Sequence, residues 1–221
     1  MSEKCYMPLA QDMTSYRGCA WTLGEWKEYK SPAPFCGPGG FHGYVHPLLA
    51  VLHNQLHANI RDPRLFEAEA AGKTIYDWQM QLKAQRMRIV REITVPAISL
   101  EQRVAYGIYC AKAVYSDPRW NEWADAWLSG MDRSQSAAKS AVKEAYRQCK
   151  AAALAADAAM RAALVADELC AADAAGKQTL VTWVAVKAAA AAKWAALTGR
   201  ADLVSCAERA MGMVEAPGGT A

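Results

Sequence analysis

The sequence contains no Cys-x-x-Cys pair, and its seven cysteines are scattered along the 221 residues. An odd number of widely spaced cysteines is typical of reduced thiols and not of a disulfide framework. The first residues lack the basic and apolar blocks of a signal peptide, and no uncharged apolar run is long enough to span a membrane. We therefore expect a cytoplasmic protein with no membrane partner.

Several catalytic and cofactor signatures are also missing. There is no Gly-x-Ser-x-Gly elbow and no His-Glu-x-x-His motif, and the glycines at 37–40 have neither P-loop nor dinucleotide-binding spacing. The net charge of +3 is spread evenly, with no basic stripe. Arg86, Arg88 and Arg91 fall on an alternating segment and are expected on a solvated strand face. These absences predict no bound cofactor and no nucleic-acid partner.

The composition changes near residue 98, where a glycine-containing sequence with short β-like runs is followed by an alanine-rich sequence. Pro96 disfavours helix at the preceding residue, and Ser99 to Gln102 form a capping box that opens a helix. We predict an α+β protein with three parts: a small N-terminal mixed α/β domain (1–98), an alanine-rich helical bundle (99–213) and a flexible tail (214–221).

Alternation of apolar and polar residues predicts four strands in the N-terminal domain, at 4–9, 20–29, 64–70 and 86–93. Residues 71–85 are expected to form a turn and a short connection between the last two strands. The glycine cluster predicts a loop that includes His42, because glycine and proline interrupt regular structure there. Pro47 suits the first turn of a helix that runs to about residue 58.

The second half predicts a bundle with helices at about 100–115, 118–129, 177–198 and 201–211. Between residues 132 and 175 there is no glycine or proline, and a single helix of that length would extend about 65 Å, so we expect a bend or loop near 155–158 or 166–172. Trp120, Trp123 and Trp127 recur at helical spacing and form one aromatic stripe. Burial in the core is the favoured interpretation, and a partner-binding surface is the alternative.

All four histidines lie within sixteen positions of one another. His53 and His57 are four residues apart on one predicted helix, a spacing that lets two imidazoles reach one metal ion. His46, His42 or Cys36 could supply a third ligand. The favoured interpretation is that both rings flank the buried leucine stripe with their polar edges in water, and a third alternative is that they contact a ligand.

His42 lies between the glycine cluster and the predicted helix, where backbone N–H groups can converge on an anion. It could therefore contact a phosphate or nucleotide, or it could hold the loop closed. Glu67 and Glu69 share one strand face. That Glu-x-Glu pair resembles one subclass of ADP-ribosyltransferases, in which a carboxylate stabilises an oxocarbenium-like transition state.

A broader resemblance rests on the Asp-Met-Thr-Ser-Tyr-Arg-Gly turn, the Trp-Thr-Leu-Gly-Glu-Trp segment, the Cys-Gly-Pro-Gly-Gly-Phe-His motif and the Arg-Ile-Val-Arg-Glu strand. Together these resemble an uncharacterised phage-associated family over about residues 4–94. The alanine-rich half is loosely similar to helical putative immunity domains. The resemblance implies a phage or mobile-element origin and no particular reaction.

Two functions follow as hypotheses. The first is a non-catalytic accessory protein that binds a host or defence protein in the host-cell cytoplasm. The second is a nucleotide-binding transferase with a ligand site at Tyr16, Arg17, His42, Glu67 and Glu69.

Overall fold

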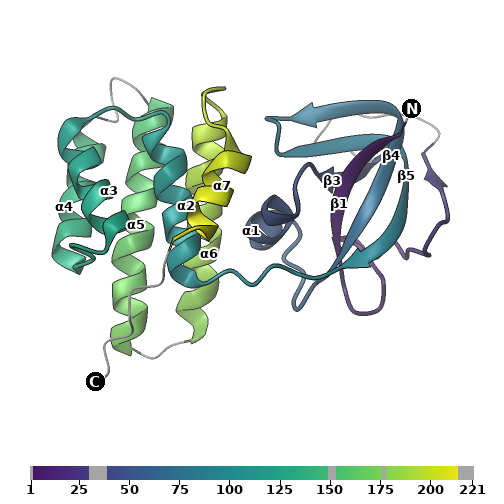
Figure 1. Ribbon diagram of the computed structural model, residues 1–221, viewed down its shortest axis with the longest axis horizontal. Coiled ribbons are helices and arrows are strands. Elements are labelled where there is room, and N and C mark those ends of the chain that lie inside the picture. Colours follow the sequence, from purple (N-terminus) through teal and green to yellow (C-terminus); the bar gives the residue numbers. More distant parts are fainter. Residues whose placement is uncertain (1, 30–38, 149–152, 176–177, 214–221) are drawn as a thin grey trace. The chain divides into compact units, whose positions relative to one another are not determined.

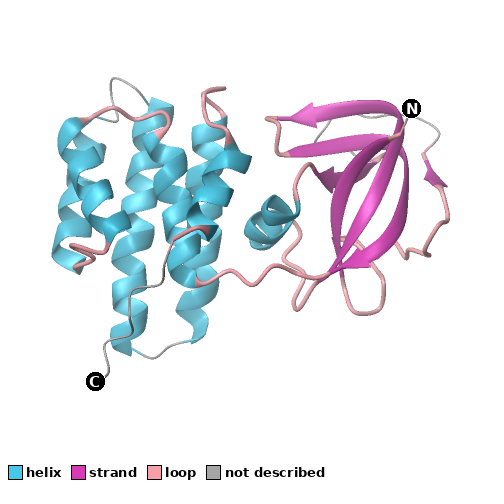
Figure 2. Ribbon diagram, in the orientation of Figure 1, coloured by secondary structure: helices cyan, strands magenta, loops and turns pink. Residues whose placement is uncertain are grey.

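The computed structural model describes residues 2–29, 39–148, 153–175 and 178–213. It contains a sheet in the N-terminal half and helices in the C-terminal half, which confirms the predicted α+β class (Figure 2). The chain divides into two compact units, Met1–Ala97 and Ile98–Ala221. None of the described helices is both long enough and apolar enough to cross a membrane.

The N-terminal unit is a small barrel of antiparallel strands (Figure 1). Strands β1 (Glu3–Leu9), β3 (Phe41–Tyr44), β4 (Arg64–Asp77) and β5 (Gln81–Ile93) form its wall. β1 pairs with both β3 and β4, and β5 pairs with the same two strands, so the four strands close into a ring. The short strand β2 (Lys27–Glu28) pairs with β5 beyond the end of β3. Closure removes the unpaired edges that an open sheet of this size would expose.

Side chains that alternate along each strand fill the barrel interior. In β1, for example, Cys5, Met7 and Leu9 point inward and are almost completely buried. Burial raises the pKa of the Cys5 thiol to about 12, so this thiol stays protonated at neutral pH. The interior cluster consists of Cys5, Met7, Leu9, Trp21, Phe41, Phe66, Ala68, Ala70, Leu82, Ala84, Met87 and Ile89.

Two predictions about the extent of the strands in this unit are wrong. Residues 71–85, expected to be a connection, mostly belong to the β4–β5 hairpin, because the strands continue past a register irregularity between Ala71 and Thr74. Gly72 at this point has a φ of 77°, which bends the strand and interrupts the alternation that sequence reasoning relies on. The predicted strand at 20–29 is reduced to β2, with isolated bridges at Ala20 and Leu23.

Helix α1 (Pro47–His57) packs against β1 and β3 on the outside of the barrel. Pro47 is in its first turn as predicted, and His46 is the N-cap, whose ring nitrogen accepts from the backbone N–H of Leu48 at 3.3 Å. Leu49 and Leu52 are buried. The helix therefore covers one outer face of the barrel and places His53 and His57 near it.

The C-terminal unit is a bundle of six helices within the described residues: α2 (Leu100–Lys112), α3 (Pro118–Ser129), α4 (Gln135–Gln148), α5 (Ala153–Ala175), α6 (Gln178–Ala196) and α7 (Leu203–Met211). The predicted capping box at Ser99 and Gln102 is present. Both positions expected for a bend or loop, 155–158 and 166–172, lie inside the continuous helix α5, so a loop at either position is wrong. Alanine favours helix at every position, so the pattern carries little information about where one helix ends. The predicted tail, 214–221, lies outside the described residues.

The tryptophan stripe is part of the helical core. Trp120, Trp123 and Trp127 are exposed by 0%, 8% and 1%, so the alternative of a partner-binding surface at these residues is wrong. Trp120 makes edge-to-face contacts with Tyr115 and Trp123, at ring-centroid distances of 5.6 Å and 5.4 Å. The large apolar area of three indoles favours burial over presentation to solvent.

Candidate functional site

Two of the four histidines, His53 and His57 on α1, lie in a polar cluster between this helix and the barrel. The Nε2 amide of Gln81 donates to His57 Nδ1 at 2.6 Å, and the hydroxyl of Tyr44 lies 3.1 Å from the same nitrogen. Because the nitrogen of an amide can only donate, His57 Nδ1 accepts, and the neutral ring carries its proton on Nε2. The His53 ring, which is fully buried, stacks on His57 at 5.7 Å between centroids. Burial also raises the pKa of Tyr44, which therefore stays protonated.

This arrangement gives the metal hypothesis little support. Over the residues that the structure describes, no group of three or more His, Cys, Asp or Glu side chains could hold a metal ion. His57 Nδ1 is already an acceptor within the protein, and His46 caps α1. Cys36, a possible third ligand, lies outside the described residues. The spacing of His53 and His57 is explained by packing of their rings between the helix and the sheet.

The predicted ligand site is spread over three parts of the barrel unit. His42 lies on β3 and not in a loop, and its side chain is exposed. The Gly-Phe-His motif belongs to the sheet because the preceding residue, Phe41, packs into the barrel core. Tyr16 and Arg17 lie in the segment after β1, with the Arg17 guanidinium 5.4 Å from the Tyr16 ring centroid. Tyr16 is 58% exposed. Glu67 and Glu69 lie on β4.

Both carboxylates on β4 take part in ion pairs across the outer face of the barrel. Glu67 lies 2.9 Å from the Lys4 ammonium and 2.7 Å from the Arg91 guanidinium. Glu69 lies 2.8 Å from Arg88. The hydrogen bond from Lys4, followed by that from Arg91, holds the pKa of Glu67 below its usual value. These contacts explain the Glu-x-Glu pattern as cross-strand pairing.

Replacing Glu67 by glutamine should make the stability of the protein less sensitive to acid. A carboxylate with a lowered pKa in the folded state stabilises the protein above its unfolded pKa of roughly 4.3, and this contribution is lost as pH falls through the folded pKa. Because Lys4 and Arg91 are solvated, we expect an effect below about 1 kcal/mol. Thermal unfolding between about pH 6 and pH 3 measures it. Glu25→Gln, at an exposed position, is the control; an equal change there would refute the prediction.

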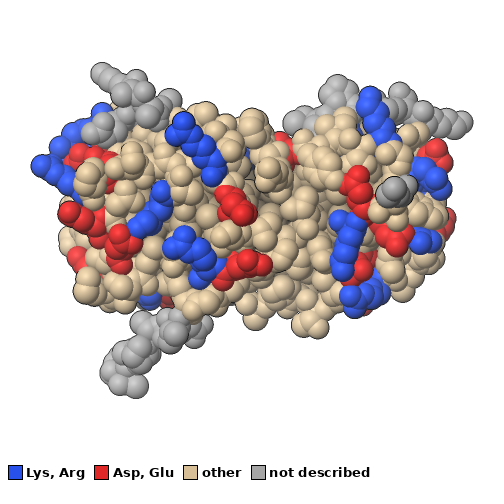
Figure 3. Space-filling view, turned by 45° about the horizontal axis from the view of Figure 1, so that its top comes forward, with Lys and Arg blue, Asp and Glu red and all other residues tan. Residues whose placement is uncertain are grey.

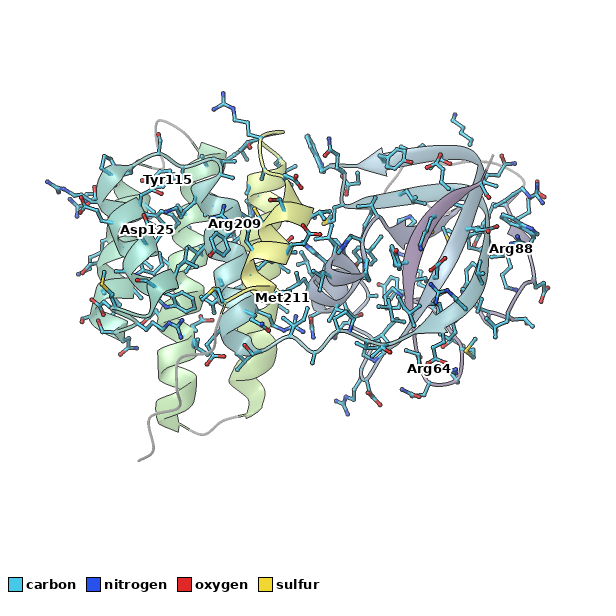
Figure 4. All side chains as sticks on the ribbon, viewed as in Figure 1. Arg64, Arg88, Tyr115, Asp125, Arg209 and Met211 are labelled. Atoms are coloured by element: carbon cyan, nitrogen blue, oxygen red, sulfur yellow. The ribbon has the colours of Figure 1, made fainter. Side chains whose placement is uncertain are left out.

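The arginines on β5 lie in the same kind of mixed-charge surface. Arg86 and Arg88 flank the Trp26 ring at 4.9 Å each, and Arg86 also pairs with Glu28. Figure 4 shows Arg88 and Arg64 on the outside of the barrel unit, and Arg64 pairs with Glu92 at 2.6 Å. Basic and acidic side chains are interspersed on the face shown in Figure 3. Each of these arginines therefore contacts an acidic or aromatic side chain of the same chain, as expected for a solvated strand face.

A shallow groove of about 790 Å³ lies on the helical unit, where α2, α3 and α7 meet. The Arg209 guanidinium lies 4.2 Å from the Tyr109 ring centroid, and Asp125 forms an ion pair with Lys112. Figure 4 labels Asp125 and Arg209 on these helices. Sequence reasoning did not indicate this groove, because its lining comes from helices that are far apart in the chain.

The tip of the β4–β5 hairpin is a second feature that sequence reasoning missed. Trp78 and Gln79 both have positive φ, 50° and 56°, in the tight turn closed by the bond from Met80 N to Asp77 O at 2.9 Å. Such turns favour Asn-Gly, and left-handed backbone costs other residues about 1–2 kcal/mol each. Trp78 is 47% exposed and its neighbour Tyr76 is 54% exposed. The turn therefore exposes Trp78 on an unfavourable backbone, two residues after the exposed Tyr76 of β4.

Residues 4–101 match the family model described as a domain of unknown function (DUF7666). The match covers the barrel unit and ends at the start of α2. No curated protein and no solved structure matches the chain. The family description names no activity, so the geometry of the barrel is the basis for a functional proposal.

Proposed function

We propose that this protein acts by binding a protein partner through the tip of the β4–β5 hairpin. The observation that supports this proposal is the strained turn at Trp78 and Gln79, which exposes an indole on a rigid, closed barrel. Backbone strain of this kind occurs most often at functional sites. Tryptophan and tyrosine are also the residues that most often dominate the binding energy of protein interfaces.

The chemistry of the tip is suited to an apolar pocket with a polar rim. Trp78 offers a large ring, while the Tyr76 hydroxyl hydrogen-bonds the Glu3 carboxylate at the edge of the sheet. This bond, together with burial, raises the pKa of Tyr76 to about 12 and keeps the hydroxyl protonated. Met80, fully buried after the turn, anchors the tip to the barrel. Such anchoring lowers the conformational entropy that binding would cost.

The partner that we propose is a host or defence protein, bound in the host-cell cytoplasm by an accessory protein of phage or mobile-element origin. The proposed origin rests on the resemblance of residues 4–94 to an uncharacterised phage-associated family, and the family model that matches residues 4–101 does not bear on it. The pairing of Glu67 and Glu69 with basic side chains favours a binding role over catalysis, because these carboxylates already stabilise the sheet. A nucleotide-binding transferase is accordingly the second hypothesis.

The test replaces Trp78-Gln79 by Asn-Gly in the full chain. This pair suits the turn, so we expect the barrel to remain folded with its stability unchanged or raised by about 1 kcal/mol. Binding to the captured partner should weaken by at least thirtyfold, as expected for removal of an interface tryptophan. Affinity capture from host cells followed by direct titration with the purified partner measures the loss.

Tyr16→Ala and Tyr146→Ala are the matched controls, since these tyrosines are 58% and 70% exposed at other places on the chain. Both variants should bind as the wild type does. Unchanged binding by the Asn-Gly variant would refute the proposed surface. A loss of binding by Tyr146→Ala alone would instead assign the interface to the helical unit.

A further inference from the structure

Two cysteines of the helical unit face each other across a helix–helix contact. Cys110 on α2 is completely buried, and Cys206 on α7 is 6% exposed. Both are free thiols. A single buried thiol is usually an inert, small apolar side chain, whereas two thiols in contact can share a proton and be oxidised together. The pair therefore has a chemistry that neither cysteine has alone.

Helices α2 and α7 run antiparallel, and two contacts besides the cysteines establish their register. The side-chain amide of Gln102 donates to the carbonyl of Met211 at 3.3 Å. Further along α2, the centroid of the Tyr109 ring lies 4.2 Å from the Arg209 guanidinium. Increasing position on α2 thus corresponds to decreasing position on α7, on which Figure 4 labels Met211 and Arg209. In this register the two cysteines, one next to Tyr109 and the other about one turn before Arg209, lie opposite each other.

The two thiols are hydrogen-bond partners, and their surroundings make them chemically unequal. The hydrogen bond from Cys110, followed by the positive charge of Arg209, lowers the pKa of the Cys206 thiol against the opposing effect of its burial. Complete burial raises the pKa of the Cys110 thiol well above its usual value. Cys206 therefore loses its proton first, and its thiolate is the better nucleophile of the two.

We propose that Cys110 and Cys206 are a redox-active pair, which a peroxide converts into a disulfide that joins α7 to α2. Two thiols in hydrogen-bonding contact need only small side-chain rotations to reach the geometry of a disulfide. A bond of this kind is reversible and regulatory and is not part of a structural framework. The pair belongs to the helical unit and the hairpin tip to the barrel unit, so either proposal can fail without the other.

The reaction balances with one peroxide molecule for each pair. The Cys206 thiolate attacks one oxygen of hydrogen peroxide, the O–O bond breaks, and the sulfur becomes a sulfenic acid. The hydroxide that leaves takes up the proton that Cys206 had lost, which gives water. The Cys110 sulfur then attacks the Cys206 sulfur, the S–O bond breaks, and hydroxide leaves with the Cys110 proton as a second water. Two electrons pass from the sulfurs to the peroxide, and a dithiol reductant reverses the bond by exchange.

The disulfide acts on a helix that has one main support. Among the described elements, α7 packs mainly on α2. Tyr109 and Arg209, which line the groove of the helical unit, come from these two helices. A covalent link restricts the unfolded chain and so favours the state in which α7 is docked. Oxidation therefore fixes this side of the groove, and reduction releases it.

The experiment treats the reduced full chain with an equimolar amount of hydrogen peroxide, blocks the remaining thiols with iodoacetamide and maps the tryptic peptides by mass spectrometry. We expect peptides 104–112 and 201–209 to be joined, and dithiothreitol to separate them. The link should raise the midpoint of thermal unfolding of the helices by about 5 °C or more. In urea, where the folded helices no longer hold the thiols together, its yield should fall by about tenfold or more.

Single substitutions test the order of the steps. Cys110→Ala removes the second thiol, so dimedone should label a persistent sulfenic acid at Cys206, whereas Cys206→Ala should leave Cys110 unlabelled. Cys5, whose pKa burial raises to about 12, is the internal control in the wild type. It should be oxidised about tenfold more slowly than Cys206. Peptides 104–112 and 201–209 that stay unlinked, or oxidation of Cys5 as fast as that of Cys206, would overturn the proposal, and both results come from the wild-type chain even if a variant does not fold.

Discussion

Replacing Trp120 by alanine is expected to lower the free energy of unfolding of the helical unit by about 3–5 kcal/mol. Trp120 is completely buried and contacts the rings of Tyr115 and Trp123 edge to face. Truncation removes both contacts and leaves a large cavity that the surrounding helices can fill only in part. Urea unfolding followed by far-UV circular dichroism measures the loss, because most of the helical signal comes from this unit.

Trp120→Phe is the informative second variant. The indole N–H of Trp120 is buried and has no hydrogen-bond acceptor among the described residues. Phenylalanine therefore keeps much of the apolar contact and removes an unsatisfied donor, so its cost should be well below that of alanine. Tyr146→Ala, at a position 70% exposed, should be almost neutral. A Trp120→Ala variant with wild-type stability would contradict the assignment of the tryptophan stripe to the core.

Replacing Gly43 by alanine is expected to destabilise the barrel unit by about 1–3 kcal/mol, the usual cost of overpacking a core. A Cβ at Gly43 would lie 2.7 Å from Cys5 Sγ and 3.0 Å from Cys5 Cβ. Both atoms are inside the closed barrel, where pairing of β1 with β3 and β4 restricts any movement apart. Denaturant unfolding monitored by tryptophan fluorescence measures the change.

A double variant tests the cause of this loss. Cys5→Ala removes the sulfur that collides with the new methyl group, so it should restore much of the stability of Gly43→Ala. The two substitutions should therefore be non-additive by about 1 kcal/mol or more. Gly212→Ala is the control, since that glycine has a φ of −76° and its Cβ would make only ordinary contacts. Additive losses in the double variant would show that the steric explanation is wrong.

Trp120 and Gly43 illustrate what the local sequence can and cannot indicate about packing. The helical spacing of Trp120, Trp123 and Trp127 places their side chains on one face, and hydrophobicity then favours burial. Gly43 has no comparable signal. Its need for a small side chain arises from β1, 38 residues earlier in the chain, and appears only when the barrel closes.

The candidate sites differ in the same way. The Gly-Phe-His motif and its neighbouring glycines were identified from composition, but the burial of Lys83 beside Gly40 was not, because the two residues meet only when β3 pairs with β5. Trp78 was placed in a connection because the irregularity after Ala71 hides the strand pattern on either side of the turn. The metal hypothesis for His53 and His57 relied on a helix that was predicted correctly. It could not include the hydrogen bond to His57, because the donor, Gln81, lies on β5 and is distant in the sequence.

The sequence by itself determined the α+β class, the change from strands to helices near residue 98, helix α1 with its N-terminal proline, and the apolar face of α3. Each of these depends on side-chain periodicity or on capping residues close together in the chain. Closure of the barrel, the full length of the β4–β5 hairpin and the surroundings of Trp78 and Lys83 were decided only by the tertiary structure. They depend on pairing between distant strands, and the energy of such pairing is not encoded in any single segment.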